Sequence, residues 1–238
     1  MVFDHCTGAI DGLSITIRCP SVEESKNQAR FFSGRYKKHC MNVQAVCDAD
    51  CKVIALTVKH CGSTNDASAY VSSNLKHTCE TQQYPYHWVG DAAYPQSQHL
   101  MVPYTGTKLH PPKDWVNFWH SQVRITIERC FGIFMQRWGI FWKPPRMNLD
   151  HGIAVIEACF RLHNFILSEE STHLLTNSSS CESMCPSLTP NETLANEQFQ
   201  DMDRDQSFAN APNGGNALRE RYKEKVRRYN WSHSRSHH

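Results

Sequence analysis

The chain has 238 residues, a mass of 27.4 kDa and 40% apolar residues, enough for one substantial folded core. Its formal net charge of +2 by itself says little about a nucleic-acid partner. No run of about 18 apolar residues occurs, the first residues lack the pattern of a secretion signal, and the 11 cysteines lack paired spacing. These features argue against a membrane-spanning, secreted or disulfide-stabilised protein, and they predict a cytosolic or nuclear one with free thiols.

The first half of the chain contains a strand followed by a hairpin. Apolar and polar residues alternate at 13–18, which predicts a half-buried strand that starts just after Asp11. A second alternating segment at 41–45 leads through a polar turn at 48–50 into an apolar run at 53–58. The order predicts three strands, of which the last two pair as a hairpin.

Two further acids follow at the boundaries of predicted elements. Residues 62–64 end the third strand and offer helix caps, which places Asp66 in the first turn of a short helix. A fourth strand at about 86–90 ends at Asp91. Acids at strand ends and at a helix start can converge in the folded chain.

Two helices are predicted in the second half. Apolar residues recur every three or four positions from 116 to 138, and a second helix covers 151–167. On the first helix, Glu128 lies at the edge of the apolar face with Arg124 one turn away. Three tryptophans of this region are predicted to be core residues: Trp119, Trp138 and Trp142.

Composition divides the chain into a domain and a tail. Residues 1–170 form the predicted domain, and 171–217 form a polar linker with 1 basic and 6 acidic side chains that we predict to be disordered. Residues 218–238 form a basic arm with 7 basic and 2 acidic side chains, in which 217–229 are predicted to be helical.

Each acid also has a simple structural explanation. Asp11 could be a turn residue, Asp66 and Asp91 could be ordinary acids beside a helix or turn, and Glu128 could pair with an arginine. The order of the elements carries more weight than any single acid. It is the order of the RNase H-like fold, an α/β fold with a mixed sheet flanked by helices, in which carboxylates gather around two divalent ions for phosphodiester chemistry.

Several motifs strengthen this interpretation: Ala-Ile-Asp-Gly at 9–12, Gly-Ser-x-x-Asp at 62–66, Gly-Asp-x-x-Tyr-Pro at 90–95, the run from Asn117 to Gly132 that contains Ile-Glu-Arg, and Leu-His-Asn at 162–164. Together they resemble the DDE endonuclease domain of PIF/Harbinger transposases and their domesticated derivatives, over about 8–167. In two places the chain departs from that pattern, with Arg-Tyr-Lys-Lys-His at 35–39 and alanine rather than glycine at 93.

The resemblance implies a metal-dependent DNA endonuclease with Mg²⁺ or Mn²⁺ as cofactor. Its catalytic acids would be Asp11, Asp91 and Glu128. Asp66 would join them as a further metal ligand, and the alternative is that Asp66 itself is the second acid of the family. Basic side chains could contact DNA phosphates: Arg35, Lys37, Lys38, Arg124 and Arg129.

The resemblance also implies DNA as the partner, a Myb-like accessory DNA-binding protein and a nuclear location, and it leaves the oligomeric state open. Relatives carry a helix-turn-helix region before the first aspartate, so either this sequence is a fragment or that region has been lost. Two other functions stay open. One is a domesticated, catalytically silent DNA- or chromatin-binding protein; the other is an unrelated metal-dependent phosphohydrolase.

Overall fold

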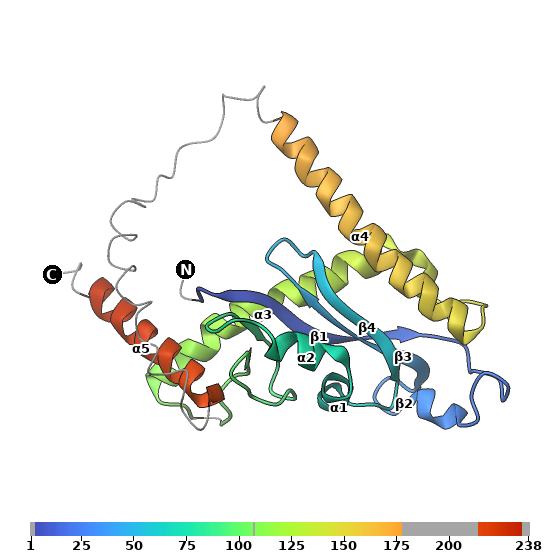
Figure 1. Cartoon of the computed structure of the whole chain (residues 1–238), viewed down its shortest axis with the longest axis horizontal. Coiled ribbons are helices and arrows are strands. Elements are labelled where there is room, and N and C mark those ends of the chain that lie inside the picture. The colour runs from blue at the N-terminus through green and yellow to red at the C-terminus, as the bar shows by residue number, and fades with distance from the viewer. Residues whose placement is uncertain (1–2, 107, 178–213, 235–238) are drawn as a thin grey trace.

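The computed structural model describes residues 3–106, 108–177 and 214–234. Its centre is a six-stranded mixed sheet flanked by helices on both faces (Figure 1). This confirms the predicted α/β class. The strands are β1 (Cys6–Thr16), β2 (Phe32–Ser33), β3 (Lys38–Cys47), β4 (Val53–Cys61), β5 (His87–Val89) and β6 (Leu100–Met101).

The central strand β1 has a different neighbour on each side. It pairs antiparallel with β3 and parallel with β5, while β4 lies antiparallel on the far side of β3 and β6 lies parallel beside β5. The short β2 pairs with the beginning of β3. The predicted hairpin is therefore confirmed as β3 and β4.

The start of the first strand was predicted too late. β1 begins at Cys6 rather than after Asp11, so this acid lies in the middle of the strand. The reason is the short run Ala9–Ile10, whose side chains are both buried, one on each face of the sheet. A segment buried on both faces lacks the alternation on which the prediction depended.

The helices form one layer on each face. The helices α1 (Asp66–Val71) and α2 (Asn74–Glu80) cover one face, and α3 (Pro111–Arg137) and α4 (Leu149–Asn177) cover the other (Figure 1). Two short 3₁₀ helices, η1 (Gln28–Phe31) and η2 (Gly139–Phe141), lie in connecting segments. The predicted helix at Asp66 and the two predicted helices of the second half are thus present as α1, α3 and α4, with α3 and α4 longer than predicted, whereas α2 was not predicted.

The basic C-terminal segment forms a helix that packs on the domain. This helix, α5 (Gly214–Ser234), buries Leu218, Tyr222 and Val226 in the core shared with α3. Tyr222 stacks on Phe3 with ring centroids 4.3 Å apart. Most of the predicted linker, residues 178–213, lies outside the described residues, so its predicted disorder stays a prediction.

Further features named in the sequence analysis can be compared with the structure. The nine cysteines in the described part of the chain are free thiols, as predicted, and Cys181 and Cys185 lie outside it. Trp142 was wrongly assigned to the core, because 69% of its surface is exposed. Among the described residues, no helix is both long and apolar enough to span a bilayer.

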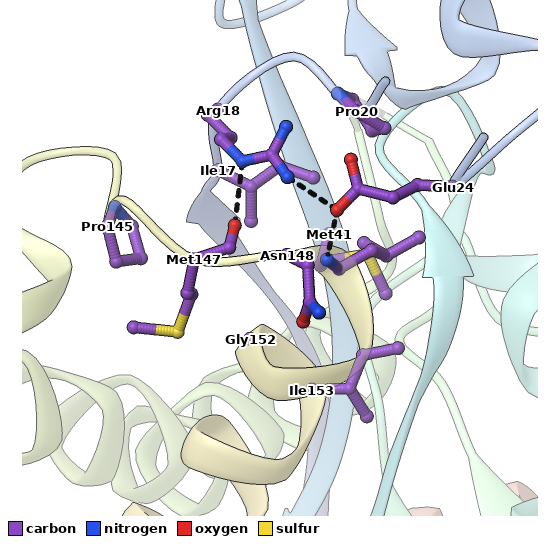
Figure 2. A pocket seen from close by; sticks show the side chains of 11 residues that line it. Ile17, Arg18, Pro20, Glu24, Met41, Pro145, Met147, Asn148, Gly152 and Ile153 are labelled. Carbon is purple, nitrogen blue, oxygen red and sulfur yellow. Dashed lines mark hydrogen bonds and ion pairs between the residues drawn. The ribbon is translucent and has the colours of Figure 1, made fainter. Parts of the chain in front are cut away.

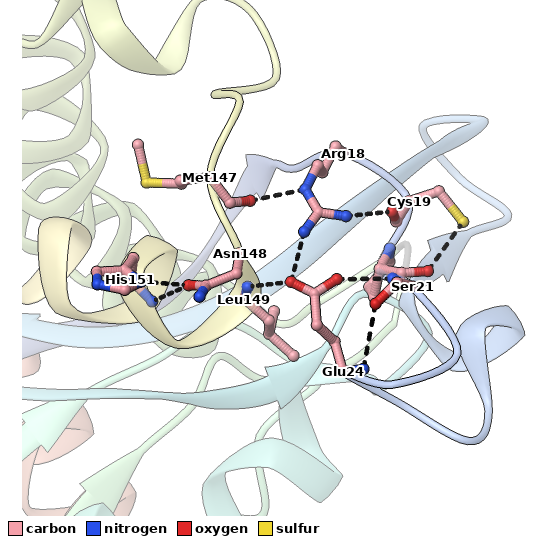
Figure 3. A network of polar contacts seen from close by, with 9 residues as sticks. Arg18, Cys19, Ser21, Glu24, Met147, Asn148, Leu149 and His151 are labelled. Carbon is pink, nitrogen blue, oxygen red and sulfur yellow. Dashed lines mark hydrogen bonds and ion pairs between the residues drawn. The ribbon is translucent and has the colours of Figure 1, made fainter.

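A polar node joins the end of β1 to the start of α4. It closes a small cavity of about 20 Å³ that is lined by residues from both segments (Figure 2). The Glu24 carboxylate accepts hydrogen bonds from the Ser21 and Leu149 backbone N–H groups at 2.6 and 2.8 Å and from the Arg18 guanidinium at 2.5 Å (Figure 3). Arg18 also donates to the Met147 carbonyl at 2.7 Å. One carboxylate therefore holds a loop and a helix N-terminus together.

These hydrogen bonds predict a pH-dependent contribution to stability. The Ser21 N–H, with help from Leu149 and Arg18, lowers the pKa of Glu24 to about 2 from an ordinary value near 4.5. The stabilisation is then complete above about pH 4.5 and is lost as the pH falls towards 2. We expect Glu24→Gln to lower Tm by a few degrees at pH 7 and the difference to vanish near pH 2. Thermal melts of both proteins across that range test this, and a pH-independent difference would contradict it.

Candidate active site

Asp11 lies in the middle of the sheet, on its central strand. It is opposite Ala45 of β3, and its side chain is 21% exposed. One carboxylate oxygen accepts the N–H of the next residue, Gly12, at 2.8 Å. Side chains at every second position of a strand point to the same face of the sheet. Ala9 and Ile15 are buried in the core under α3 and α4, so Asp11 lies on the same face, the one that α3 covers.

The pairing of β1 with β5 places Asp91 beside Asp11 at the same height along the sheet. Ala9 pairs with Val89 of β5, so Asp91, two residues further along its chain, is level with Asp11. Gly90 donates its N–H to the Met101 carbonyl at 2.9 Å, which holds the end of β5 against β6. The Asp91 carboxylate accepts the Ala93 N–H at 2.9 Å and so stabilises the turn that follows the strand.

The titration of Asp11 reflects these neighbours. Burial is the largest cause that raises its pKa from 3.8 to about 6. The Gly12 N–H lowers the pKa, the charge of Asp91 raises it, Arg124 lowers it and Asp66 raises it. Asp91 and Asp66 are thus close enough for their charges to disfavour the charged form of Asp11.

Glu128 is connected to this pair through Arg124. Both lie on α3, one turn apart, and the Arg124 guanidinium is 2.5 Å from the Glu128 carboxylate and 3.4 Å from that of Asp11. The Glu128 side chain is 48% exposed. Arg124 therefore lies between two of the three predicted catalytic acids, which confirms its predicted place beside Glu128.

Asp66 approaches from the opposite face of the sheet. Its Oδ1 accepts hydrogen bonds from Gln44 Nε2 at 2.7 Å and Asn42 Nδ2 at 3.0 Å. The Tyr94 hydroxyl donates to Gln44 Oε1 at 2.5 Å. A Cβ on Gly12 would lie 2.2 Å from Asp66 Oδ1, so the carboxylate rests directly on the backbone of the central strand.

This buried network is the part of the site that the sequence analysis missed. Asn42 and Gln44 resemble the solvent face of an alternating strand, yet Gln44 is fully buried and Asn42 is 6% exposed. The pKa of Tyr94 is raised by burial and by the charges of Asp11, Asp66 and Asp91. Two amides in i, i+2 spacing opposite a glycine are the sequence signal that could have indicated it.

The remaining predicted DNA-contacting residues lie away from the acids. Arg35, Lys37 and Lys38 are exposed around the β2–β3 turn. Lys38 is seven positions along β3 from Ala45, the residue opposite Asp11, a distance of about 23 Å at the rise of a strand. Arg129 donates instead to the Cys51 sulfur at 3.2 Å and to the Ala49 carbonyl at 3.4 Å.

The acids suit a divalent cation by donor type and by charge. Carboxylate oxygens are the ligands that Mg²⁺ and Mn²⁺ prefer, and Arg124 is in contact with only two of the four acids. In the described part of the chain, no three His, Cys, Asp or Glu side chains form a group ready to hold a metal ion. The Glu128 carboxylate instead forms an ion pair with Arg124.

The comparisons with known proteins agree with this geometry. A family model described as DDE superfamily endonuclease matches residues 10–164, about two thirds of the chain. This range includes all four acids and ends within α4. Neither the curated proteins nor the solved structures gave a match. Because the model covers well over half of the sequence, the chain belongs to the DDE superfamily endonuclease family.

Proposed function

We propose that this protein is a divalent-metal-dependent DNA endonuclease of the transposase type, in which Asp11, Asp91 and Glu128 are the catalytic acids. The observation that carries the proposal is that Asp91, just after the end of β5, is level with Asp11 on the neighbouring parallel strand β1, with Glu128 connected to Asp11 through Arg124. Family membership supports nuclease chemistry.

The side chains would have separate roles. Mg²⁺ or Mn²⁺, when bound, would activate the attacking water or 3′-hydroxyl and stabilise the leaving oxygen. Asp11 and Asp91 would hold the metal from a rigid sheet, and Glu128 would complete the set from α3. Asp66, fixed by Gln44 and Asn42 on the other face, is the weakest candidate ligand, and it positions the central strand beneath Asp11.

The finer assignments belong to the same proposal. We place the protein among PIF/Harbinger-type transposase derivatives on the motifs around Asp11, Asp91 and Glu128. Duplex DNA is the proposed substrate, the nucleus its proposed location and a Myb-like protein its proposed accessory partner.

Plasmid nicking tests the catalytic assignment. Purified full-length protein should nick supercoiled DNA in Mn²⁺, and EDTA should stop the reaction. Loss of outer-shell partners of a metal typically costs about 10–100-fold, so Asp91→Asn and Glu128→Gln should each reduce nicking by more than about 100-fold. Gel assays of the nicked product over time provide the rates.

A control variant tests whether loss of nicking is specific to the acids of the site or follows from the loss of any acid. Glu80→Gln changes a half-exposed acid on α2 that pairs with Lys76, and it should leave nicking unchanged. Nicking that survives Asp91→Asn would contradict the catalytic assignment. DNA binding without any nicking by the wild type would favour the other function, a catalytically silent DNA-binding protein, for which the 2.5 Å pairing of Glu128 with Arg124 is the supporting observation.

A further inference from the structure

A second concave region lies at the far end of β1. It is a hollow of about 460 Å³ whose lining includes Arg18, Lys38, His39 and Trp142. Thr16, which also lines it, is five positions along β1 from Asp11, or about 17 Å at the rise of a strand. The hollow is therefore separate from the acids but joined to them by one rigid strand.

Trp142 presents a large aromatic surface to this hollow. Its side chain is 69% exposed, although its indole N–H is fixed by a 2.7 Å hydrogen bond to the Met135 carbonyl at the end of α3. The ring is thus held in place with much of its surface free. An exposed aromatic ring that is held in place can stack on a planar ligand such as a nucleic-acid base.

The surroundings of the hollow are basic. Its lining residue Lys38 is exposed, and so are four neighbours from the β2–β3 turn and the loop after η2. The four exposed basic neighbours are Arg35, Lys37, Lys143 and Arg146. The segments that contain them, 34–47 and 129–149, have no acidic residue. This charge is complementary to a polyanion.

One wall of the hollow is formed by Arg18, whose side chain is held by hydrogen bonds and whose charge is paired with Glu24. Arg18 is held by the Met147 carbonyl, the Cys19 carbonyl and the Glu24 carboxylate (Figure 3). Behind it, the cavity of Figure 2 is too small for more than about one water molecule. The end of β1 and the loop before α4 are therefore joined by hydrogen bonds, so a ligand would meet a preorganised surface.

We propose that this hollow binds an unpaired stretch of a DNA strand, with a base stacked on Trp142 and phosphates near Lys38. Bases inside a duplex are already stacked on both faces, so a fixed ring can stack only on a base that is unpaired. The choice of DNA rests on the proposed function. At the rise of about 3.4 Å per nucleotide of a stacked strand, the roughly 17 Å from Asp11 corresponds to at most about five nucleotides.

Binding without metal tests the subsite. Fluorescence anisotropy with a labelled 15-nucleotide oligo-dT in EDTA should show that Trp142→Ala raises Kd roughly 5- to 150-fold, since stacking on an aromatic side chain is worth about 1–3 kcal/mol per base. Trp142→Phe should retain most of the affinity. Lys38→Gln should reduce the salt dependence, with a slope of log Kd against log salt that is smaller by about 0.7.

Two controls make the result specific. Trp115→Ala removes another exposed tryptophan, 43% exposed at the opposite end of α3, and should leave oligo-dT binding unchanged. Trp142→Ala should weaken binding of a duplex of equal length much less than binding of oligo-dT. Equal binding by both alanine variants, or equal weakening for single strand and duplex, would overturn the proposal.

The readout is independent of the catalytic proposal. Oligo-dT binding is measured in EDTA, where the proposed metal-dependent nicking does not occur. If wild-type protein fails to nick plasmid, Trp142-dependent binding still supports the subsite. If the protein nicks plasmid but Trp142→Ala binds oligo-dT normally, the subsite fails and the catalytic assignment stands.

Discussion

Asp11→Asn is expected to raise Tm in EDTA at pH 7, while it abolishes metal-dependent nicking. Burial and the charge of Asp91 raise the pKa of Asp11 from 3.8 to about 6, so the folded protein holds an unfavourable charge at neutral pH. The shift corresponds to at most ~3 kcal/mol, or roughly 5–10 °C in Tm for a chain of this size. Asparagine removes the charge and can still accept the Gly12 N–H.

The sign of the pH dependence follows from the raised pKa. Below about pH 4, Asp11 is protonated in both the folded and the unfolded protein, so the variant should gain nothing there. The gain should grow between pH 4 and 6 and be complete above 6. Differential scanning calorimetry of both proteins from pH 4 to 8 measures it.

The same melting experiment is repeated with Mn²⁺ to test metal binding. Mn²⁺ should raise Tm of the wild type and leave that of Asp11→Asn nearly unchanged, because binding to the folded state stabilises it by mass action. Asp114→Asn, at an exposed acid in the first turn of α3, should behave as the wild type in both conditions. A variant at Asp11 that melts at or below the wild-type temperature in EDTA at pH 7 would refute the argument.

Gly12→Ala is expected to destabilise the protein and to suppress nicking together. The added Cβ would lie 2.2 Å from Asp66 Oδ1 and 2.7 Å from Gln44 Nε2, distances at which something must move. Both side chains are held by buried hydrogen bonds, so relief would break the network or shift β1. Overpacking of this kind costs about 1–3 kcal/mol.

Activity should fall further than stability alone requires. Asp11 is the residue next to the substitution, and its carboxylate accepts the Gly12 N–H. A shift of about 1 Å in a catalytic group can reduce a rate by about 100-fold. Chemical denaturation and plasmid nicking at a temperature where the variant is fully folded separate the two effects.

Gly132→Ala is the matched control for this substitution. Gly132 lies within α3, where an added Cβ meets nothing within 4 Å. Alanine there should stabilise the protein by about 0.5–1 kcal/mol, because glycine is unfavourable inside a helix. If both glycine variants show the same small effect, the close approach of Asp66 to β1 does not constrain the site.

Much of the scaffold is predictable because its periodic patterns are local. The alternation in β3 and the spacing of three and four along α3 each predict their element correctly. The start of β1 was not predictable in this way, because Ala9 and Ile10 are buried on opposite faces. The packing of α5 on the domain was not predictable from the sequence either. Its buried Leu218, Tyr222 and Val226 are separated by basic residues that dominate its composition.

The site is predictable in its acids but not in their support. The motifs indicate Asp11, Asp91 and Glu128, and chain order suggests that they meet. The side of the sheet from which each acid approaches depends on strand register, and no local pattern encodes it. For the same reason Asn42 and Gln44 were treated as solvent-facing, whereas they hold Asp66 against Gly12 in the interior.

The stacking of Tyr222 on Phe3 has a consequence for biosynthesis. The Tyr222 hydroxyl bonds to the Asp4 carbonyl across 218 positions of chain, just before the central strand begins. A ribosome delivers β1 before α5, so the chain around Asp4 gains this contact only after the segment 218 positions later has been made. Nascent chains halted before α5 emerges should therefore display uncovered apolar surface, which is what chaperones bind.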